Sequence, residues 1–226
     1  MHCMSAQGRP VSAQGSTVSF IARAAIALAM ALLLGACAAP NTPSQTNVEA
    51  KAAEVLKASF VERGQAKLDR LTQDETQHLC TEAQTKAPPK DIAEKIEKLN
   101  LATIKWPTDG KYLGNWQNGE KVAQEGRGKQ YSDDPQGPVG GNCYACHQLT
   151  KEEVSFGTIG PSLYNFGKLR GYTADMQKYA YGKVYNAEAY TACTNMPRFG
   201  HSGILTEAQI KDVVALLMDP NSPVNK

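Results

Sequence analysis

The sequence predicts an all-α protein with long loops and an N-terminal helical extension. Apolar residues recur at helical spacing in several stretches, and no alternating strand pattern of useful length occurs. A Thr-x-x-Gln capping box at residues 206–209 opens the last of these stretches. We therefore divide the chain into an export signal (residues 1–36), a tether with a helical extension (residues 37–117) and a C-terminal domain (residues 118–226).

Residues 1–36 have the pattern of a signal peptide. Arg9 and Arg23 are their only charged residues, and the apolar run 24–34 is 11 residues long. A bilayer-spanning helix needs about 20 apolar residues. A basic region, a short apolar region and small residues are typical of secretory signals, so we expect a periplasmic protein.

The end of this signal has two interpretations. Leu34-Gly35-Ala36-Cys37 resembles a bacterial lipoprotein box, in which Cys37 is lipidated, whereas Ala36-Cys37-Ala38 also fits ordinary signal cleavage. If Cys37 is lipidated, Ala38 rather than Asp follows it, which by resemblance to enterobacterial sorting favours the outer membrane. The polar, proline-containing segment Ala39–Thr46 would then tether the domain to a membrane.

Two helices are expected in the extension. An amphipathic helix is predicted over Val48–Leu71, with a break near Gly64, and a second one over Asp91–Asn100. A polar stretch that contains Cys80 separates them. These helices either offer a surface to a partner or pack on their own domain.

The C-terminal domain is expected to begin with a helix that Asn118 caps and that runs toward Tyr131. A glycine-rich, irregular stretch follows, with a short helix over Thr173–Ala180. The closing helix starts after Thr206 and stops at Pro220. Its apolar face contains Ile210, Val213, Val214 and Leu217.

The charge balance excludes one class of function. With 24 basic and 22 acidic residues the chain is nearly neutral, so it builds no large positive field and we expect no nucleic-acid partner. The sequence contains no Ser-His-Asp set, catalytic carboxylate pair or phosphate-binding loop. We interpret Asp133-Asp134 as the polar end of a helix.

The motif that carries chemistry is Gly141-Asn142-Cys143-Tyr144-Ala145-Cys146-His147, which contains C-x-x-C-H. Residues i and i+3 of a helical turn share a face, so Cys143 and Cys146 can bind the two vinyl groups of one haem. His147 then supplies the proximal iron ligand. The sequence thus predicts one covalent haem c. A thioredoxin-like redox pair and a zinc site are the alternatives.

The sixth iron ligand is predicted to be Met196. It lies in a non-helical loop, and Pro197 stiffens the backbone directly after it. The alternatives are Met176, Met218, His78 and His201, of which the two methionines are expected to fill the core. A thioether ligand raises the potential of the iron, which suits an electron acceptor.

Two further features surround this site. The loop Gly157-Thr158-Ile159-Gly160-Pro161 can place a backbone carbonyl where it accepts the His147 Nδ1 proton, or it simply needs glycine geometry. With Cys143 and Cys146 on haem and the other N-terminal cysteines in or next to the signal, Cys80 and Cys193 remain as an even pair. We predict a disulfide between them.

From Asn118 to its end the chain resembles a class I cytochrome c, and more narrowly the SoxX family, the monohaem subunit of the SoxAX thiosulfate-oxidising cytochrome. The motifs that carry the resemblance are Gly141–His147, Gly157–Leu163 and Asn195–Gly200. The resemblance implies an all-α, class I cytochrome c-like domain. The long segment before Trp116 departs from compact members of the family, as does the lipoprotein-like signal.

The resemblance also implies partners. A SoxX-like chain forms a heterodimer with a SoxA-like haem subunit, where thiosulfate is joined oxidatively to a cysteine of a SoxYZ-like sulfur carrier. This chain would be the non-catalytic, electron-transfer subunit of that L-cysteine S-thiosulfotransferase complex and would pass electrons to a downstream cytochrome c. The alternatives are a general periplasmic electron shuttle and a haem-based sensor, and Met196-Pro197 disfavours the sensor because it fills the sixth position.

Overall fold

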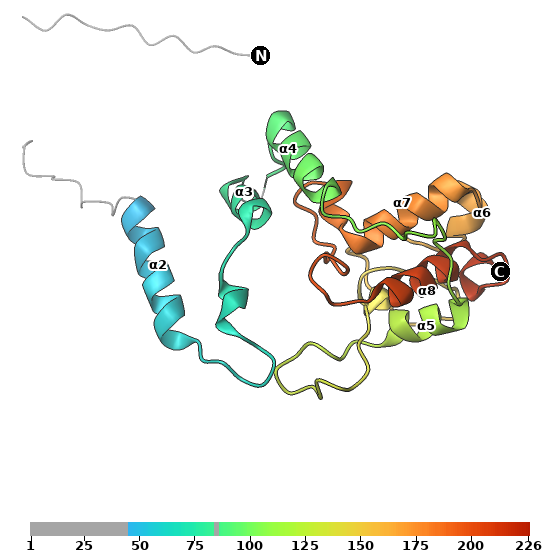
Figure 1. Ribbon diagram of the computed structural model, residues 1–226, viewed down its shortest axis with the longest axis horizontal. Helices are drawn as coiled ribbons and strands as arrows, with labels where there is room; N and C mark the ends of the chain where they lie inside the picture. The colour runs from blue at the N-terminus through green and yellow to red at the C-terminus, as the bar shows by residue number, and fades with distance from the viewer. Residues whose placement is uncertain (1–44, 84–85) are drawn as a thin grey trace, which may run out of the picture. The chain divides into compact units, whose positions relative to one another are not determined.

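The computed structural model describes residues 45–83 and 86–226 (Figure 1). The α-helices are α2 (Gln45–Ser59), α3 (Glu75–Ala83), α4 (Lys90–Leu101), α5 (Trp116–Gln124), α6 (Phe166–Arg170), α7 (Ala174–Tyr185) and α8 (Glu207–Met218). Short 3₁₀ helices are Leu68–Leu71, Cys143–Ala145, Ala187–Ala189 and Pro223–Asn225. Within these described ranges, the β-type pairing is one isolated bridge between Arg63 and Ala66. The predicted all-α class is therefore confirmed.

The predicted signal peptide and the predicted lipidation at Cys37 lie outside the described residues, as does most of the tether Ala39–Thr46. Of the helices in residues 45–83 and 86–226, none is long and apolar enough to cross a membrane. The chain divides into two compact units, residues 1–57 and 58–226, which are described separately.

The first unit contributes most of α2, and the helical stretch predicted over Val48–Leu71 is interrupted, as expected near Gly64, but the interruption starts earlier. Helix α2 ends at Ser59, and the chain then makes a tight turn in which Gly64 adopts a φ of 51°. The expected apolar face is not buried, because Val48 and Val55 are each 53% exposed. Alternating alanine and charged residues give this helix too little apolar area to hold it against a core.

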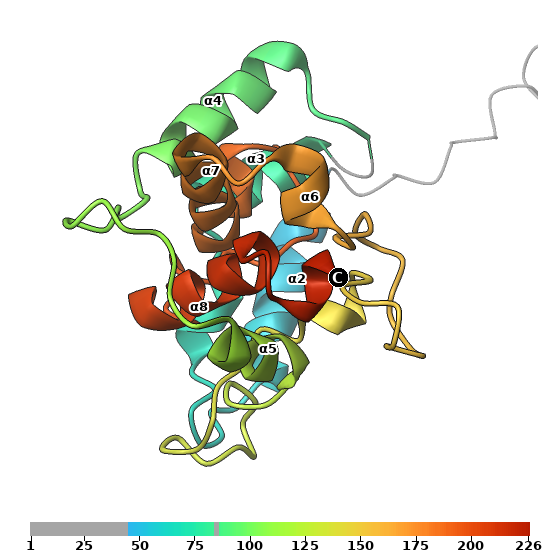
Figure 2. The same ribbon diagram turned by 90° about the vertical axis from the view of Figure 1, so that its right-hand side faces the viewer.

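Residues 58–226 are built around α8. Both halves of the predicted capping box between Thr206 and Gln209 are present. The buried face of the helix includes Ile210, Val213, Val214, Leu216 and Leu217. Helices α5 and α7 pack on this face, and Figure 2 shows α4, α7, α8 and α5 one below another. The closing helix is therefore the centre of the core, as its apolar spacing indicated.

Helix α5 begins earlier than predicted. Its cap is Asn115, whose side chain accepts a 2.9 Å hydrogen bond from the Asn118 N–H, so Asn118 lies inside the helix. The helix ends at Gln124 rather than near Tyr131. Gly119 faces α8 so closely that a β-carbon there would overlap the Asp212 carbonyl oxygen, and a glycine is required at this crossing.

The early end of α5 also changes the environment of Asp133. This carboxylate does not mark a helix end but stabilises a loop, because Oδ2 accepts hydrogen bonds from the N–H groups of Gly128 and Gln130 at 2.6 and 2.9 Å. These bonds hold the pKa of Asp133 below its ordinary value. The pair Asp133-Asp134 is therefore a loop-forming element.

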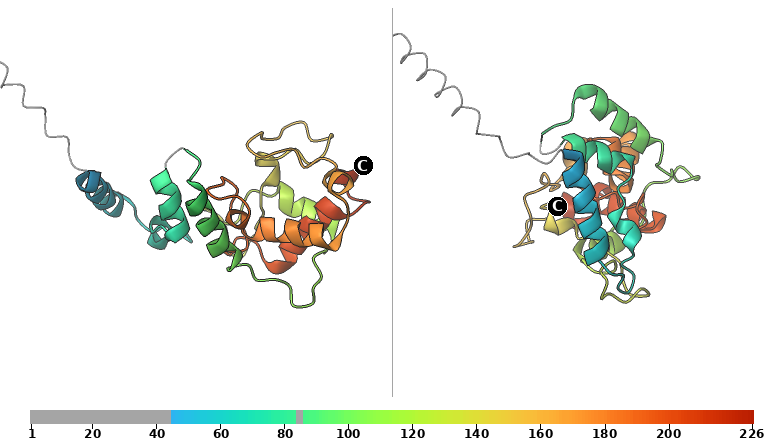
Figure 3. Two further views of the ribbon diagram at one scale, coloured as in Figure 1. Left: turned by 90° about the horizontal axis from the view of Figure 1, so that it is seen from above. Right: turned by 90° about the vertical axis from the view of Figure 1, so that its left-hand side faces the viewer.

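The second predicted extension helix is α4, which matches Asp91–Asn100 to within one residue at each end. It packs on its own domain, because Ile96 is fully buried and Asn100 is 2% exposed. The Asn186 Nδ2 at the end of α7 donates to Asn100 Oδ1 at 2.9 Å. Helix α3 was not predicted, and it lies beside α4 (Figure 3). The extension after residue 58 thus continues the C-terminal fold.

Candidate haem site

The C-x-x-C-H segment forms a single 3₁₀ turn. Asn142 enters the turn with a φ of 46°, and the N–H groups of Cys146 and His147 donate to the Cys143 carbonyl at 3.1 and 2.9 Å. Residues three apart eclipse in a 3₁₀ helix, so both thiols lie on one side of the turn. Neither cysteine is in a disulfide, and both are half-buried.

The loop from Gly157 to Pro161 lies against His147. The His147 Nδ1 is 2.7 Å from the Pro161 carbonyl oxygen. A carbonyl oxygen only accepts, so Nδ1 carries the proton and the lone pair is on Nε2. A β-carbon at Gly160 would overlap the imidazole ring, so the glycine lets the loop backbone lie directly on the ring. The predicted contact of a loop carbonyl with Nδ1 is confirmed.

The chemistry of these donors fits haem c. A half-buried imidazole with a free Nε2 is the form that ligates iron. Burial raises the pKa of the Cys143 thiol to about 12. In residues 45–83 and 86–226, no group of three or more His, Cys, Asp or Glu side chains could hold a metal ion. Zinc is disfavoured for this reason, and a thioredoxin-like redox pair is disfavoured because the described residues form no βαβ unit around the motif.

Met196 lies in the loop between Cys193 and Ile204 and packs on the core cluster that Cys143 also contacts. Its N–H donates to Thr194 Oγ1 at 3.3 Å. This cluster includes Tyr144, Leu149, Tyr185, Phe199 and Leu205. Such an apolar environment suits a haem, which is mostly hydrocarbon.

The alternative sixth ligands lie in other environments. Met218 is 1% exposed in α8 and fills the core, as expected, and Met176 is half-buried on α7. His78 is exposed on α3, where its Nε2 lies 3.3 Å from Glu82 Oε1. His201 lies in a turn, where partial burial of its ring and the nearby positive charge of Arg198 lower its pKa.

The disulfide joins Cys80 of α3 to Cys193 in the loop of Met196, with a Cα–Cα distance of 5.4 Å. Sequence reasoning missed two groups beside it. Arg198 Nη2 lies 2.6 Å from Asp74 Oδ2, and the buried Glu188 accepts a 2.6 Å hydrogen bond from the Cys193 N–H. A signal for α3 was present, since Asp74 and Gln77 form a reciprocal capping pair.

Comparisons with known proteins agree with this geometry. Residues 117–219 match the family model described as cytochrome c. The chain is also similar to an uncharacterized lipoprotein of Aquifex aeolicus (strain VF5), with 39% identity over 156 residues. The match covers 68% of this chain and 73% of that protein. A cytochrome c domain is an electron-transfer domain with covalently bound haem c.

Proposed function

Residues 117–219 of this chain form a cytochrome c domain, and on that premise we propose that the chain is the electron-transfer subunit, of the SoxX kind, of a thiosulfate-oxidising complex. Cys143 and Cys146 hold one haem c, with His147 as the proximal and Met196 as the distal iron ligand. When bound, haem c supplies a one-electron iron couple. The observation that carries the redox role is the bond between His147 Nδ1 and the Pro161 carbonyl, which leaves Nε2 available as a ligand.

The residues around this site support electron transfer rather than catalysis on the haem. With His147 and Met196 both ligating the iron, a bound haem would offer substrate no open coordination position. The chain's contribution is to orient His147 through Pro161, to hold Met196 between the disulfide and Pro197, and to exclude water with the apolar cluster. A sensor would need an easily vacated sixth position.

The resemblance of the three motifs to SoxX supports the sulfur-oxidising assignment. In this assignment a SoxA-like subunit carries out the sulfur chemistry on a SoxYZ-like carrier, and this chain passes the electrons to another cytochrome c. A general electron shuttle is the second candidate, and one observation favours it. Helix α4 buries Ile96 within its own domain, so this part of the extension is not a free surface for a dedicated partner.

We place the protein outside the cytoplasm, anchored through a lipid on Cys37. The small-residue box at Leu34–Cys37 and the similarity to a protein described as a lipoprotein support this location. Metabolic labelling with a radioactive fatty acid tests the anchor. Label in the full chain that is lost in Cys37→Ser is expected, and an unlabelled full chain would contradict it.

The partner assignment is tested by purifying the tagged mature chain from thiosulfate-grown native cells. We expect a stoichiometric second haem protein to co-purify and to be required for reduction of this chain's haem by thiosulfate with the sulfur carrier. Purification of a lone cytochrome that thiosulfate and the carrier fail to reduce would favour the general shuttle.

A further inference from the structure

A cleft of about 590 Å³ opens between α3 and the loop that carries Met196. Cys80 and Cys193 both line it, so the disulfide faces open space rather than the core. Met196 and Arg198 also line it, which places the predicted distal ligand and the disulfide on the walls of one cleft. The exposed residues Gln77 and Thr81 of α3 also line it, so part of the lining is polar.

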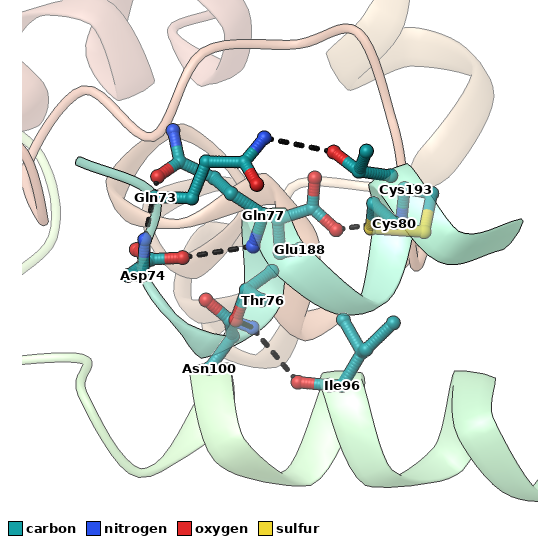
Figure 4. The surroundings of a disulfide bond; sticks show 10 residues. Gln73, Asp74, Thr76, Gln77, Cys80, Ile96, Asn100, Glu188 and Cys193 are labelled. Carbon is teal, nitrogen blue, oxygen red and sulfur yellow. Dashed lines mark hydrogen bonds between the residues drawn. A yellow bond between two sulfur atoms is a disulfide. The ribbon is translucent and has the colours of Figure 1, made fainter. Parts of the chain in front are cut away.

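Met196 lies in a segment that is anchored on both sides. Three residues before it, the disulfide ties Cys193 to α3, and two residues after it, Arg198 pairs with Asp74 at the start of α3. Figure 4 shows Glu188 beside the disulfide, where its carboxylate accepts the Cys193 N–H. The position of Met196 therefore depends on α3, a helix that lies outside the part of the chain that matches the cytochrome c model.

The backbone at one anchor is held in an uncommon conformation. Cys193 has a φ of 57°, in the left-handed region that a residue with a β-carbon seldom adopts. Such a conformation persists where the surroundings impose it. At Cys193 the disulfide and the Glu188 carboxylate impose it, so loss of the disulfide favours a relaxed backbone three residues from Met196.

We propose that Cys80–Cys193 is a thiol-accessible switch for the sixth coordination position of the haem iron. A small dithiol enters the cleft, and one of its thiolates attacks a disulfide sulfur to give a mixed disulfide and one free cysteine thiolate. Its second thiol displaces the other cysteine. The reductant leaves as a cyclic disulfide, and Cys80 and Cys193 have gained two electrons and two protons. With the disulfide open, the loop would relax and would no longer hold Met196 as the sixth ligand of a bound haem.

This switch rests on the proposed function, because it takes Met196 as the distal ligand. The test uses the mature haem-loaded protein, with the iron kept ferrous by ascorbate, and compares carbon monoxide binding before and after treatment. Treatment consists of dithiothreitol, then iodoacetamide to trap free thiols, then desalting. Peptide mass mapping reports alkylation of Cys80 and Cys193, and circular dichroism reports helix content.

We expect alkylation of both cysteines, unchanged helix content and a carbon monoxide affinity raised by more than about tenfold, because the binding-competent fraction rises. Two outcomes would overturn the switch: full alkylation with unchanged affinity, or a disulfide that dithiothreitol reduces only after denaturation. If the untreated protein already binds carbon monoxide as tightly as a Met196→Ala variant, the ligand assignment itself is wrong.

A Cys80→Ser/Cys193→Ser double variant provides the matched control. If its helix content shows that it is folded, the double variant should bind carbon monoxide as tightly as the treated protein, and dithiothreitol should not change its affinity. A folded double variant that still excludes carbon monoxide would contradict the switch.

Discussion

The His147 Nδ1 donates a hydrogen bond of 2.7 Å to the Pro161 carbonyl oxygen. This bond orients the half-buried imidazole that directly follows the C-x-x-C pair. The bond fixes the tautomer and leaves the lone pair on Nε2. Gly160 makes the bond possible because its backbone lies against the ring.

Gly160→Ala should weaken the packing of the Gly157–Pro161 loop against His147. The new β-carbon overlaps the imidazole, so the loop or the ring must shift, and we expect a loss of about 1–3 kcal/mol in the free energy of unfolding. Haem content per purified chain should fall as well. Gly126→Ala is the control, since its new β-carbon meets the side chain of Asn142 at 3.2 Å, which can move. Equal stability and haem content in both variants would contradict the packing argument.

Met196→Ala should open the iron and lower its midpoint potential, because the thioether is removed. Carbon monoxide titration and redox titration of the haem-loaded variant measure both effects. Met176→Ala removes a half-buried methionine from α7 and should change neither. A Met196→Ala protein whose haem still excludes carbon monoxide would show that another residue is the ligand.

Asp74→Asn should destabilise the Met196 loop through loss of the pair with Arg198. Partial burial alone would raise the pKa of Asp74. The hydrogen bond from the Gln77 N–H and the pairing with Arg198 act more strongly in the opposite direction and hold the pKa below its ordinary value. The pair therefore stabilises the fold above that ordinary pKa and is lost as the pH falls through the lowered one. At neutral pH we expect a loss of roughly 0.5–1 kcal/mol, because Asp74 is partly exposed and screened.

Glu75→Gln is the matched control for this variant. Glu75 pairs with Lys95 at 2.8 Å, also at the start of α3, but makes no ion pair with the Met196 loop. Thermal unfolding at several pH values compares the two variants. If the loss of stability caused by Asp74→Asn persisted unchanged in strong acid, the ion pair would be ruled out as its cause.

Glu188→Gln should stabilise the protein at neutral pH. Burial raises the pKa of Glu188, although the Cys193 N–H, Arg198 and Lys183 oppose the shift. A raised folded pKa means that folding takes up a proton, so stability falls as the pH rises from the ordinary value through the raised one. An amide still accepts the Cys193 N–H without a charge. The melting temperatures of variant and wild type should converge in acid and separate at neutral pH, and parallel curves would contradict this prediction.

The sequence was informative where one local rule decides the structure. The capping box at Thr206 and Gln209 marked α8, and cysteine parity identified the pair that the structure joins, Cys80 and Cys193. It was ambiguous where two residues satisfy the same rule, since Asn115 and Asn118 are both of a residue type that caps helices, and the helix begins after Asn115. Helix α3 was missed because its polar residues give little apolar periodicity.

Long-range electrostatics could not be predicted from the chain. Asp74 and Arg198 are far apart in sequence and meet where the disulfide joins α3 to the loop. Glu188 looks like a surface residue in its local sequence, yet it is 7% exposed because α4 and the Cys193 loop cover it. Burial of a charged group depends on tertiary contacts, which a helical pattern does not encode.

Covalent attachment of haem to this chain is tested most directly by acid–acetone extraction of the purified mature protein, followed by intact mass spectrometry. If haem is attached at Cys143 and Cys146, the extracted chain should keep the added mass of one haem. A Cys143→Ser/Cys146→Ser variant should show no added mass. Extraction of all haem from the wild type, or a mass equal to that of the bare polypeptide, would contradict the assignment of this chain as a haem c protein.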